Sequence, residues 1–255
     1  MADFSVIIPS RSIDNLVPCV ERLMMREPDL SDDRIVIVDD GIKWTQEARD
    51  LMLDCVILPN ERVDGKFVFS RAINIGIRST YHRVPLQLHG QRETFIDGGP
   101  KRHVVLLNDD ALLETQFGFT LLAKAAEEHR AFGLIGATTN ITGQPSQQPR
   151  GIGLREISHL AFVAALVPLW TLASVGLMDE RYALDYGCED ADYCEAVARA
   201  GMKVGVHDGC YVDHGSLHST FRGDPKAPRS FRQNLGLLMQ KWGGRLVSQP
   251  GLRAG

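Results

Sequence analysis

The feature of this sequence that most constrains its fold is a short, continuous apolar run that recurs and stops each time at polar residues. The runs cover residues 4–9, 34–38 and 103–107, and they end at Ser10 and Arg11, at Asp39 and Asp40, and at Asn108, Asp109 and Asp110. Segments with helical apolar spacing, such as residues 16–25 and 47–53, lie between them. Continuous apolar strands alternating with helices are typical of a parallel sheet covered on both faces. The sequence therefore predicts an α/β fold with a Rossmann-like, mostly parallel central sheet flanked by helices.

Two adjacent carboxylates, Asp109 and Asp110, follow the apolar run at residues 103–107. In open α/β sheets, ligands bind beyond the carboxyl ends of the strands, and a hard divalent cation prefers oxygen ligands. The pair is thus a candidate metal site. Aspartate after a strand is also common as a turn or helix cap, because its side chain accepts hydrogen bonds from free backbone N–H groups. The residues alone leave both interpretations open.

The rest of the first half continues the alternation. Residues 55–58 predict a short strand, and residues 65–77 carry a helical apolar stripe with Lys66 and Arg71 near its start. Cations there could meet an anionic ligand at a helix N-terminus, although exposed helix charge is the simpler explanation. Glycine, proline and polar residues at 86–102 predict an inserted loop or a short hairpin.

The second half contains a helical pattern at residues 117–129, a strand at 132–137 and a last strand at 202–206. The long irregular stretch at 138–153 predicts a functional loop, such as a lid over a ligand. Residues 161–170 are apolar throughout, so their periodicity does not separate a strand from a buried helix. A second acid cluster, Glu189, Asp190 and Asp192, opens a helical pattern that should end at Gly201.

Composition narrows the class of protein. The 255 residues are 44 % apolar, begin without a basic leader and contain no apolar run long enough to cross a bilayer, which predicts a cytoplasmic protein without a transmembrane segment. Five cysteines without a close pair argue against a disulfide framework and against a zinc knuckle. Residues 222–255 hold seven Lys or Arg residues against one acid, Asp224, so this tail carries a net charge of +6. Such a tail can bind phosphates of nucleic acid, lipid or a sugar nucleotide, although solubilising surface charge is more common.

The order of these segments resembles one family across about residues 4–219, the family 2-type glycosyltransferases of the GT-A fold. Four stretches carry the resemblance: Val6-Ile7-Ile8-Pro9-Ser10, Val38-Asp39-Asp40-Gly41, Leu106-Leu107-Asn108-Asp109-Asp110, and residues 175–182 running into Glu189-Asp190-Ala191-Asp192. The third is similar to an Asn-x-Asp form of the DxD motif. Residues 65–77 also resemble the family segment that ends in Asn-x-Gly, here Asn74-Ile75-Gly76.

The resemblance implies roles for individual residues. Asp110 would bind Mn²⁺ or Mg²⁺ together with His214, with His218 as a neighbour that could be confused with it, and Asp190 would be the general base of an inverting transfer. The remaining predicted residues would bind the nucleotide sugar: Pro9, Ser10 and Arg11 at the nucleotide, Asp39 at the base or ribose, Asn108 and Asp109 at the ribose and diphosphate, and Lys66, Arg71, Glu189 and Asp192 in support.

The predicted activity is transfer of a sugar from a UDP-, GDP- or dTDP-sugar to an acceptor hydroxyl, with the acceptor (a glycan, small molecule, lipid-linked sugar or modified nucleic acid) and the oligomeric state left open. The predicted organisation is a GT-A domain at residues 1–220, with a nucleotide-sugar half at about 1–115 and an acceptor half at about 116–220. Residues 221–255 would form a basic C-terminal extension.

Three alternatives stay open on the sequence. Histidine metal ligands also occur in retaining GT-A enzymes, so the stereochemical outcome is not fixed. A sugar nucleotidyltransferase would need a Gly-rich phosphate loop near the N-terminus, and residues 10–14 contain no glycine. A non-catalytic nucleotide-sugar-binding protein on the same scaffold is the third, because a fold by itself does not fix activity.

Overall fold

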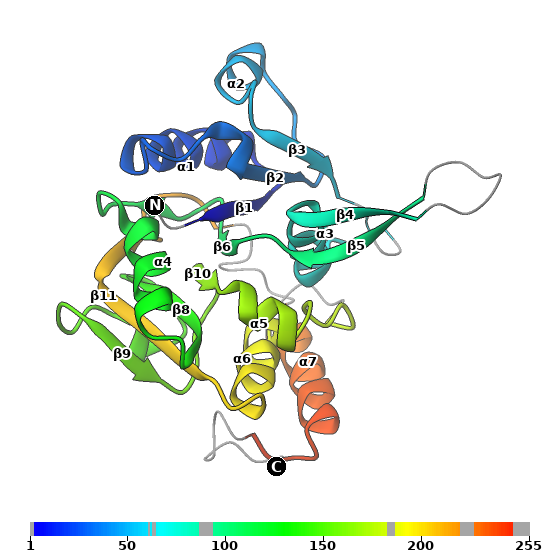
Figure 1. Ribbon diagram of the computed structural model, residues 1–255, viewed down its shortest axis with the longest axis vertical. Coiled ribbons are helices and arrows are strands. Elements are labelled where there is room, and N and C mark those ends of the chain that lie inside the picture. Colours follow the sequence, from blue (N-terminus) through cyan, green and yellow to red (C-terminus); the bar gives the residue numbers. More distant parts are fainter. Residues whose placement is uncertain are drawn as a thin grey trace.

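The central element of the protein is a nine-stranded sheet. The computed structural model describes residues 3–60, 62, 65–86, 94–182, 187–219 and 227–246. The strand order is β3-β2-β1-β6-β10-β8-β11-β7, with β9 paired to β11 (Figure 1). Six strands run in one direction: β1 (Phe4–Ser10), β2 (Ile35–Asp39), β3 (Val56–Pro59), β6 (His103–Leu107), β8 (Phe132–Thr139) and β11 (Lys203–Asp213). Three run against them: β7 (Leu112–Leu113), β9 (Leu154–Ile157) and β10 (Ala164–Val167). The predicted mostly parallel sheet is confirmed.

Helices cover both faces of this sheet because the pleat of a buried strand sends alternate side chains to opposite faces. Val6 and Ile8 of β1 lie in one core cluster with apolar side chains of α1 (Ile13–Arg26) and α4 (Gly118–Glu128), whereas Ile7 lies in the other. That second cluster contains side chains of α3 (Phe69–Ser79), α5 (Leu169–Ser174) and α6 (Glu189–Arg199). The short α2 (Gln46–Leu51) follows β2, and α7 (Ala227–Lys241) packs beside α6 in a third cluster with Leu238 and Met239.

Helix α3 approaches β1 closely at the Asn-x-Gly segment. A Cβ atom placed on Gly76 would lie 2.4 Å from Cγ2 of Ile7, so only glycine permits this packing distance. The helix begins at Phe69, four residues later than the start of the stripe predicted at residues 65–77. Gly201 follows α6 with φ +79°, which confirms the predicted left-handed end of that helix.

Three further predictions are resolved or corrected by long-range pairing. Residues 161–170 contain strand β10, which pairs antiparallel with β6 and β8. They also contain the start of α5. A hairpin of β4 (Tyr81–Leu86) and β5 (Thr94–Pro100) accounts for the insertion before β6, and the residues between these two strands lie outside the described part. The last strand does not stop at Val206 but continues to Asp213, past a register shift between His207 and Tyr211, because β8 and β7 supply partners for its polar second half.

Within the described ranges, every helix is too short or too polar to cross a lipid bilayer.

Candidate functional site

A cavity of about 690 Å³ opens where the parallel strands end. Nine residues predicted for the site line it: Pro9, Ser10, Arg11, Asn108, Asp109, Asp110, Glu189, Asp190 and His214. They come from the ends of β1, β6 and β11 and from the start of α6, which are segments far apart in the sequence. Asp39, Lys66, Arg71 and Asp192 are not among the lining residues. The cavity therefore joins the two predicted acid clusters in one space.

The first acid cluster is organised by the pairing of β1 with β6. Because these strands are parallel neighbours, Ser10 and Asp109 meet at their ends, where Oγ of Ser10 donates a hydrogen bond of 2.6 Å to Oδ2 of Asp109. Burial raises the pKa of Asp109 to about 6, the bond from Ser10 opposes this change, and the neighbouring Asp110 adds to it. Two neighbouring carboxylates in a buried position repel each other, so a bound cation would stabilise their ionised forms.

Asp110 and His214 form the other half of this cluster. Nε2 of His214 lies 3.0 Å from Oδ1 of Asp110, and Nδ1 of His214 lies 2.8 Å from the backbone carbonyl oxygen of Ile141. A carbonyl at Nδ1 favours the tautomer in which Nε2 presents its lone pair, as in many metal-bound histidines. Adjacent ligands of an octahedral ion at about 2.1 Å are about 3.0 Å apart, so the two atoms fit one Mn²⁺ or Mg²⁺ ion.

The described residues contain no group of three or more His, Cys, Asp or Glu side chains placed to hold a metal ion. Two protein ligands are nevertheless sufficient when a bound diphosphate supplies further oxygens, which is the common arrangement for Mg²⁺. Asp110 and His214 therefore fit a metal that is shared with a phosphorylated ligand.

The second acid cluster faces the cavity from the first turn of α6. Oδ1 of Asp190 accepts a 2.7 Å hydrogen bond from the backbone N–H of Ala191. Burial, with the adjacent Asp190, raises the pKa of Glu189 and favours its neutral form. His159 also lines the cavity, with Nε2 3.7 Å from Oδ2 of Asp190. The sequence analysis missed His159, because a single histidine before an apolar run carries no signal of its own.

Asp39, Lys66 and Arg71 have other surroundings. Oδ1 of Asp39 accepts hydrogen bonds from the backbone N–H groups of Gly41 and Ile42 at 2.8 and 2.7 Å, and Oδ2 accepts one from the Trp44 indole at 2.8 Å. Asp39 thus shapes the turn after β2. Lys66 is exposed, and Arg71 lies 3.5 Å from Glu180. Their predicted contacts with a nucleotide sugar stay predictions.

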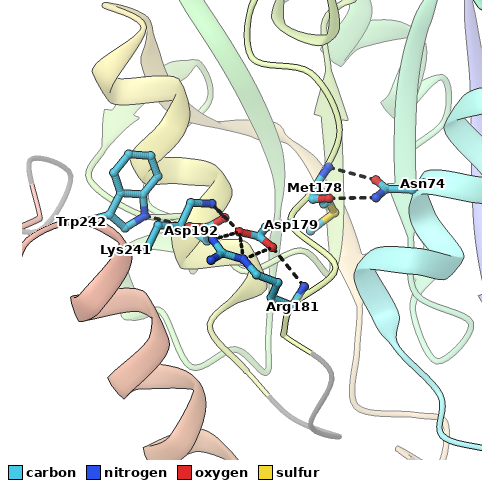
Figure 2. A network of polar contacts seen from close by, with 7 residues as sticks. All are labelled: Asn74, Met178, Asp179, Arg181, Asp192, Lys241 and Trp242. Atoms are coloured by element: carbon cyan, nitrogen blue, oxygen red, sulfur yellow. Dashed lines mark hydrogen bonds and ion pairs between the residues drawn. The ribbon is translucent and has the colours of Figure 1, made fainter. Parts of the chain in front are cut away.

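Asp192 does not line the cavity; its side chain lies in a polar cluster with Asp179, Arg181 and Lys241 (Figure 2). Its Oδ2 accepts a 2.7 Å hydrogen bond from Lys241, and its Oδ1 accepts one of 2.7 Å from the Trp242 indole. Lys241 also donates to Asp179 at 2.8 Å. Arg181 and Lys241 together hold the pKa of Asp179 well below its usual range. The contacts of Asp192 therefore favour a structural role over the predicted support of the donor.

Helix α7 consequently forms part of the site. Its Phe231, Leu235 and Leu238 line the cavity on the side of Glu189 and Asp190. The basic residue Lys241, which the sequence assigns to a separate tail, is one of the groups that fix this helix to α6, together with apolar contacts of Leu238 and Met239. Sequence patterns carry no sign of this pairing, because Lys241 and Asp192 are 49 positions apart.

The Asn-x-Gly segment holds the chain that precedes the second acid cluster. Nδ2 of Asn74 donates to the backbone carbonyl of Met178 at 2.8 Å, and its Oδ1 accepts from the Met178 N–H at 2.9 Å (Figure 2). Nδ2 also lies 2.9 Å from Oε1 of Glu180. Asn74 therefore acts as a clamp between α3 and the approach to α6.

The loop predicted as a lid is anchored at its middle. Gln147 is fully buried, and its amide bonds the backbone of Ala137 at 3.2 Å and of Ala161 at 3.1 and 3.0 Å. Residues 141–144 line the cavity. Any closing motion of this loop is thus confined to the part before Gln147.

A scan of protein-family models finds no match to this chain, and a search of curated proteins finds none either. Solved structures do match. GalNAc-T7, crystallised with UDP, GalNAc and Mn²⁺, superposes with a TM-score of 0.66 at 12 % identity, over 96 % of this chain and 49 % of that one. S. aureus TarS 1-349, in complex with UDP-GlcNAc, superposes with a TM-score of 0.61 at 15 % identity, over 94 % of this chain and 66 % of that one.

These similarities show that the chain has the GT-A fold, as the sequence resemblance implies. The cavity lies at the carboxyl ends of its parallel strands, which is where open α/β sheets bind ligands. The chain spans about half the length of the GalNAc-T7 chain and just under two thirds of the TarS chain that it matches.

Proposed function

We propose that this protein is a metal-dependent glycosyltransferase that moves a sugar from a nucleoside-diphosphate sugar to an acceptor hydroxyl with inversion of configuration. One observation carries the proposal: a single cavity is lined by a two-residue metal half-site, Asp110 and His214, and by a separate carboxylate, Asp190. Transfer from a nucleotide sugar needs both functions. Negative charge develops on the departing diphosphate, and a proton must leave the attacking hydroxyl.

The donor would bind on the β1 and β6 side. Pro9, Ser10 and Arg11 line that side, and Asn108 and Asp109 lie beside them. A metal held by Asp110 and His214 would neutralise charge on the diphosphate as a Lewis acid. UDP and UDP-GlcNAc occupy the TarS structures, and UDP with Mn²⁺ is present in that of GalNAc-T7, which makes uridine nucleotides and Mn²⁺ the first ligands to test.

The acceptor would bind against α6 and α7. Asp190 is the carboxylate placed there to take the proton of the hydroxyl. Glu189 is the partner whose neutral form is favoured, because burial and the adjacent Asp190 raise its pKa. A neutral neighbour leaves Asp190 as the base, following the general rule that adjacent acids with separated pKa values take different roles. Apolar side chains of Phe231, Leu235 and Leu238 would exclude water from the reacting groups.

A two-part experiment tests the proposal. The first part screens UDP, GDP, dTDP and their sugar conjugates by thermal shift with Mn²⁺ or Mg²⁺, because ligands of the native state raise its melting temperature. The second measures transfer by the wild type, Asp190→Asn and the control Asp54→Asn, which changes an exposed aspartate after α2. We expect Asp190→Asn to keep donor affinity and lose turnover, and Asp54→Asn to keep both.

The alternatives give different results. A product that retains the anomeric configuration of the donor would identify a retaining enzyme. Binding without turnover in the wild type would identify a nucleotide-sugar-binding protein. Synthesis of a nucleotide sugar from a sugar phosphate would identify a nucleotidyltransferase.

A further inference from the structure

We propose that His159 is a positioning residue that orients Asp190 toward the acceptor hydroxyl. This inference rests on the proposed function, in which Asp190 is the general base. His159 is 3 % exposed and lies in the loop between β9 and β10, a part of the chain outside both acid clusters. Its Nε2 faces Oδ2 of Asp190 at 3.7 Å.

The loop that carries His159 is fixed to the helix that carries Asp190. Side-chain atoms of Leu160 fill the space beside Gly136 of β8, where an added Cβ would lie 2.2 Å from Leu160 Cδ1. Sγ of Cys194 in α6 contacts the backbone carbonyl of Leu160 at 3.7 Å. Phe162 packs edge to face on Tyr193 of α6, with ring centroids 6.1 Å apart. The imidazole therefore has little freedom to leave Asp190.

The hydrogen bonding of His159 is unusual for a purely structural histidine. Its Nδ1 is buried and has no hydrogen-bond partner among the described residues. Buried polar atoms are normally paired, because an unpaired one loses its bonds to water without replacement. The ring faces the Asp190 carboxylate through Nε2 and has the Cys194 side chain as its other polar neighbour, so it is placed to act on that carboxylate.

The effect of His159 on Asp190 is electrostatic. Burial lowers the pKa of His159, but Cys194 and Asp190 outweigh burial and raise it to about 10. The Asp190 carboxylate is the acidic group that faces Nε2, and its negative charge favours the imidazolium. Among the described residues on this side of the cavity, the other titratable groups are Glu189 and Cys188 of the α6 start and Tyr182 before it, and Cys194 of α6 also interacts with His159.

The pair can be tested without any activity assay. The pKa of His159 is measured by NMR of histidine-labelled protein in the wild type, in Asp190→Asn and in the control Asp54→Asn. Loss of the neighbouring carboxylate should lower the pKa of His159 by at least about one pH unit, the usual effect of one close opposite charge. Asp54→Asn should leave it unchanged. An equal His159 pKa in the wild type and Asp190→Asn would overturn the proposal.

The catalytic part is tested with His159→Gln and His159→Phe, and with His129→Gln as a control at an exposed histidine. Glutamine keeps a donor near the Nε2 position but carries no charge. We expect both His159 variants to lower kcat about 10- to 100-fold with the donor KM unchanged, comparable to the loss of other orienting residues. The acidic limb of the pH–rate profile should move to higher pH, because Asp190 loses its cation.

A His159→Gln enzyme with wild-type kcat and an unshifted profile would refute the role of His159 while leaving the glycosyltransferase proposal intact. A wild type without transfer activity would instead refute the proposed function, and with it the catalytic role of His159. The NMR titration would then report only whether the pair exists. Thermal unfolding of each variant separates a lost role from a lost fold.

Discussion

Replacing Lys241 with methionine should detach α7 from α6. Lys241 is the cation between Asp192 and Asp179, at 2.7 and 2.8 Å, and its side chain is 23 % exposed (Figure 2). Methionine keeps the length and apolar contacts of the side chain but removes its charge. The side chain of Asp192 is 4 % exposed. It would then lose Lys241 and, of the contacts drawn in Figure 2, keep the hydrogen bond from the Trp242 indole.

The magnitude follows from what each carboxylate loses. Removing one partner of a fully buried ion pair costs about 3–5 kcal/mol. Here Lys241 is partly solvated, Asp192 keeps its bond from Trp242, and Asp179 keeps its pair with Arg181, so we expect about 2 kcal/mol. For a chain of this size that free energy lowers the melting temperature by about 4–8 °C.

The effect should also depend on pH. Because the folded-state pKa of Asp179 is depressed, its stabilising contribution is present above its unfolded pKa of about 4 and is lost as the pH falls through the folded value. The difference in stability between the wild type and Lys241→Met should therefore shrink below about pH 4.

Circular dichroism and hydrogen exchange check this prediction, with Lys124→Met as the matched control at an exposed helical lysine. Amide protons of α7 should exchange faster in Lys241→Met, since the helix can undock locally before the whole chain unfolds. Equal melting temperatures and equal α7 exchange in wild type and variant would refute the reasoning. They would mean that the apolar contacts of α7 hold it alone.

Four further predictions concern the cavity. Asp110→Asn should weaken Mn²⁺-dependent binding of a nucleoside diphosphate at least about tenfold in calorimetry, and unchanged affinity would remove Asp110 from the metal site. His214→Ala should weaken Mn²⁺ binding and His218→Ala should not; the opposite ranking would transfer the role to His218. Glu189→Gln should keep kcat at pH 7 within about threefold, because the amide replaces a neutral acid. Because the folded-state pKa of Glu189 is raised, the wild type should lose stability as the pH rises above the unfolded pKa of about 4.3, and the variant should abolish this loss. Proteases should cut residues 138–153 more slowly with nucleotide and Mn²⁺ bound, and equal rates would leave the segment a plain surface loop.

The sequence determined the parts of the fold that local patterns encode. A strand buried on both faces is mostly apolar, so the runs at residues 4–9, 34–38 and 103–107 predict strands of a covered sheet, and they contain most of β1 and β2 and all of β6. Parallel strands end at the same edge, so Ser10 and Asp109 could be expected to meet there, as they do. The predicted acid cluster at the start of α6 follows the same logic, because acids favour a helix N-terminus.

Tertiary structure decided whatever depends on a partner elsewhere in the chain. Within residues 161–170, Ala164–Val167 became strand β10 because β6 and β8 offered pairing on both sides, which periodicity does not predict. His159 reached Asp190 only through the packing of its loop on α6.

Asp190 and Asp192 show the limit most directly. They are two residues apart in one helical turn, so they project about 200° apart around the helix axis. One direction leads into the cavity and the other to Lys241 of α7. The sequence determined that both acids open a helix, but which of them lines the cavity was decided by the tertiary packing of α6, including its contact with α7.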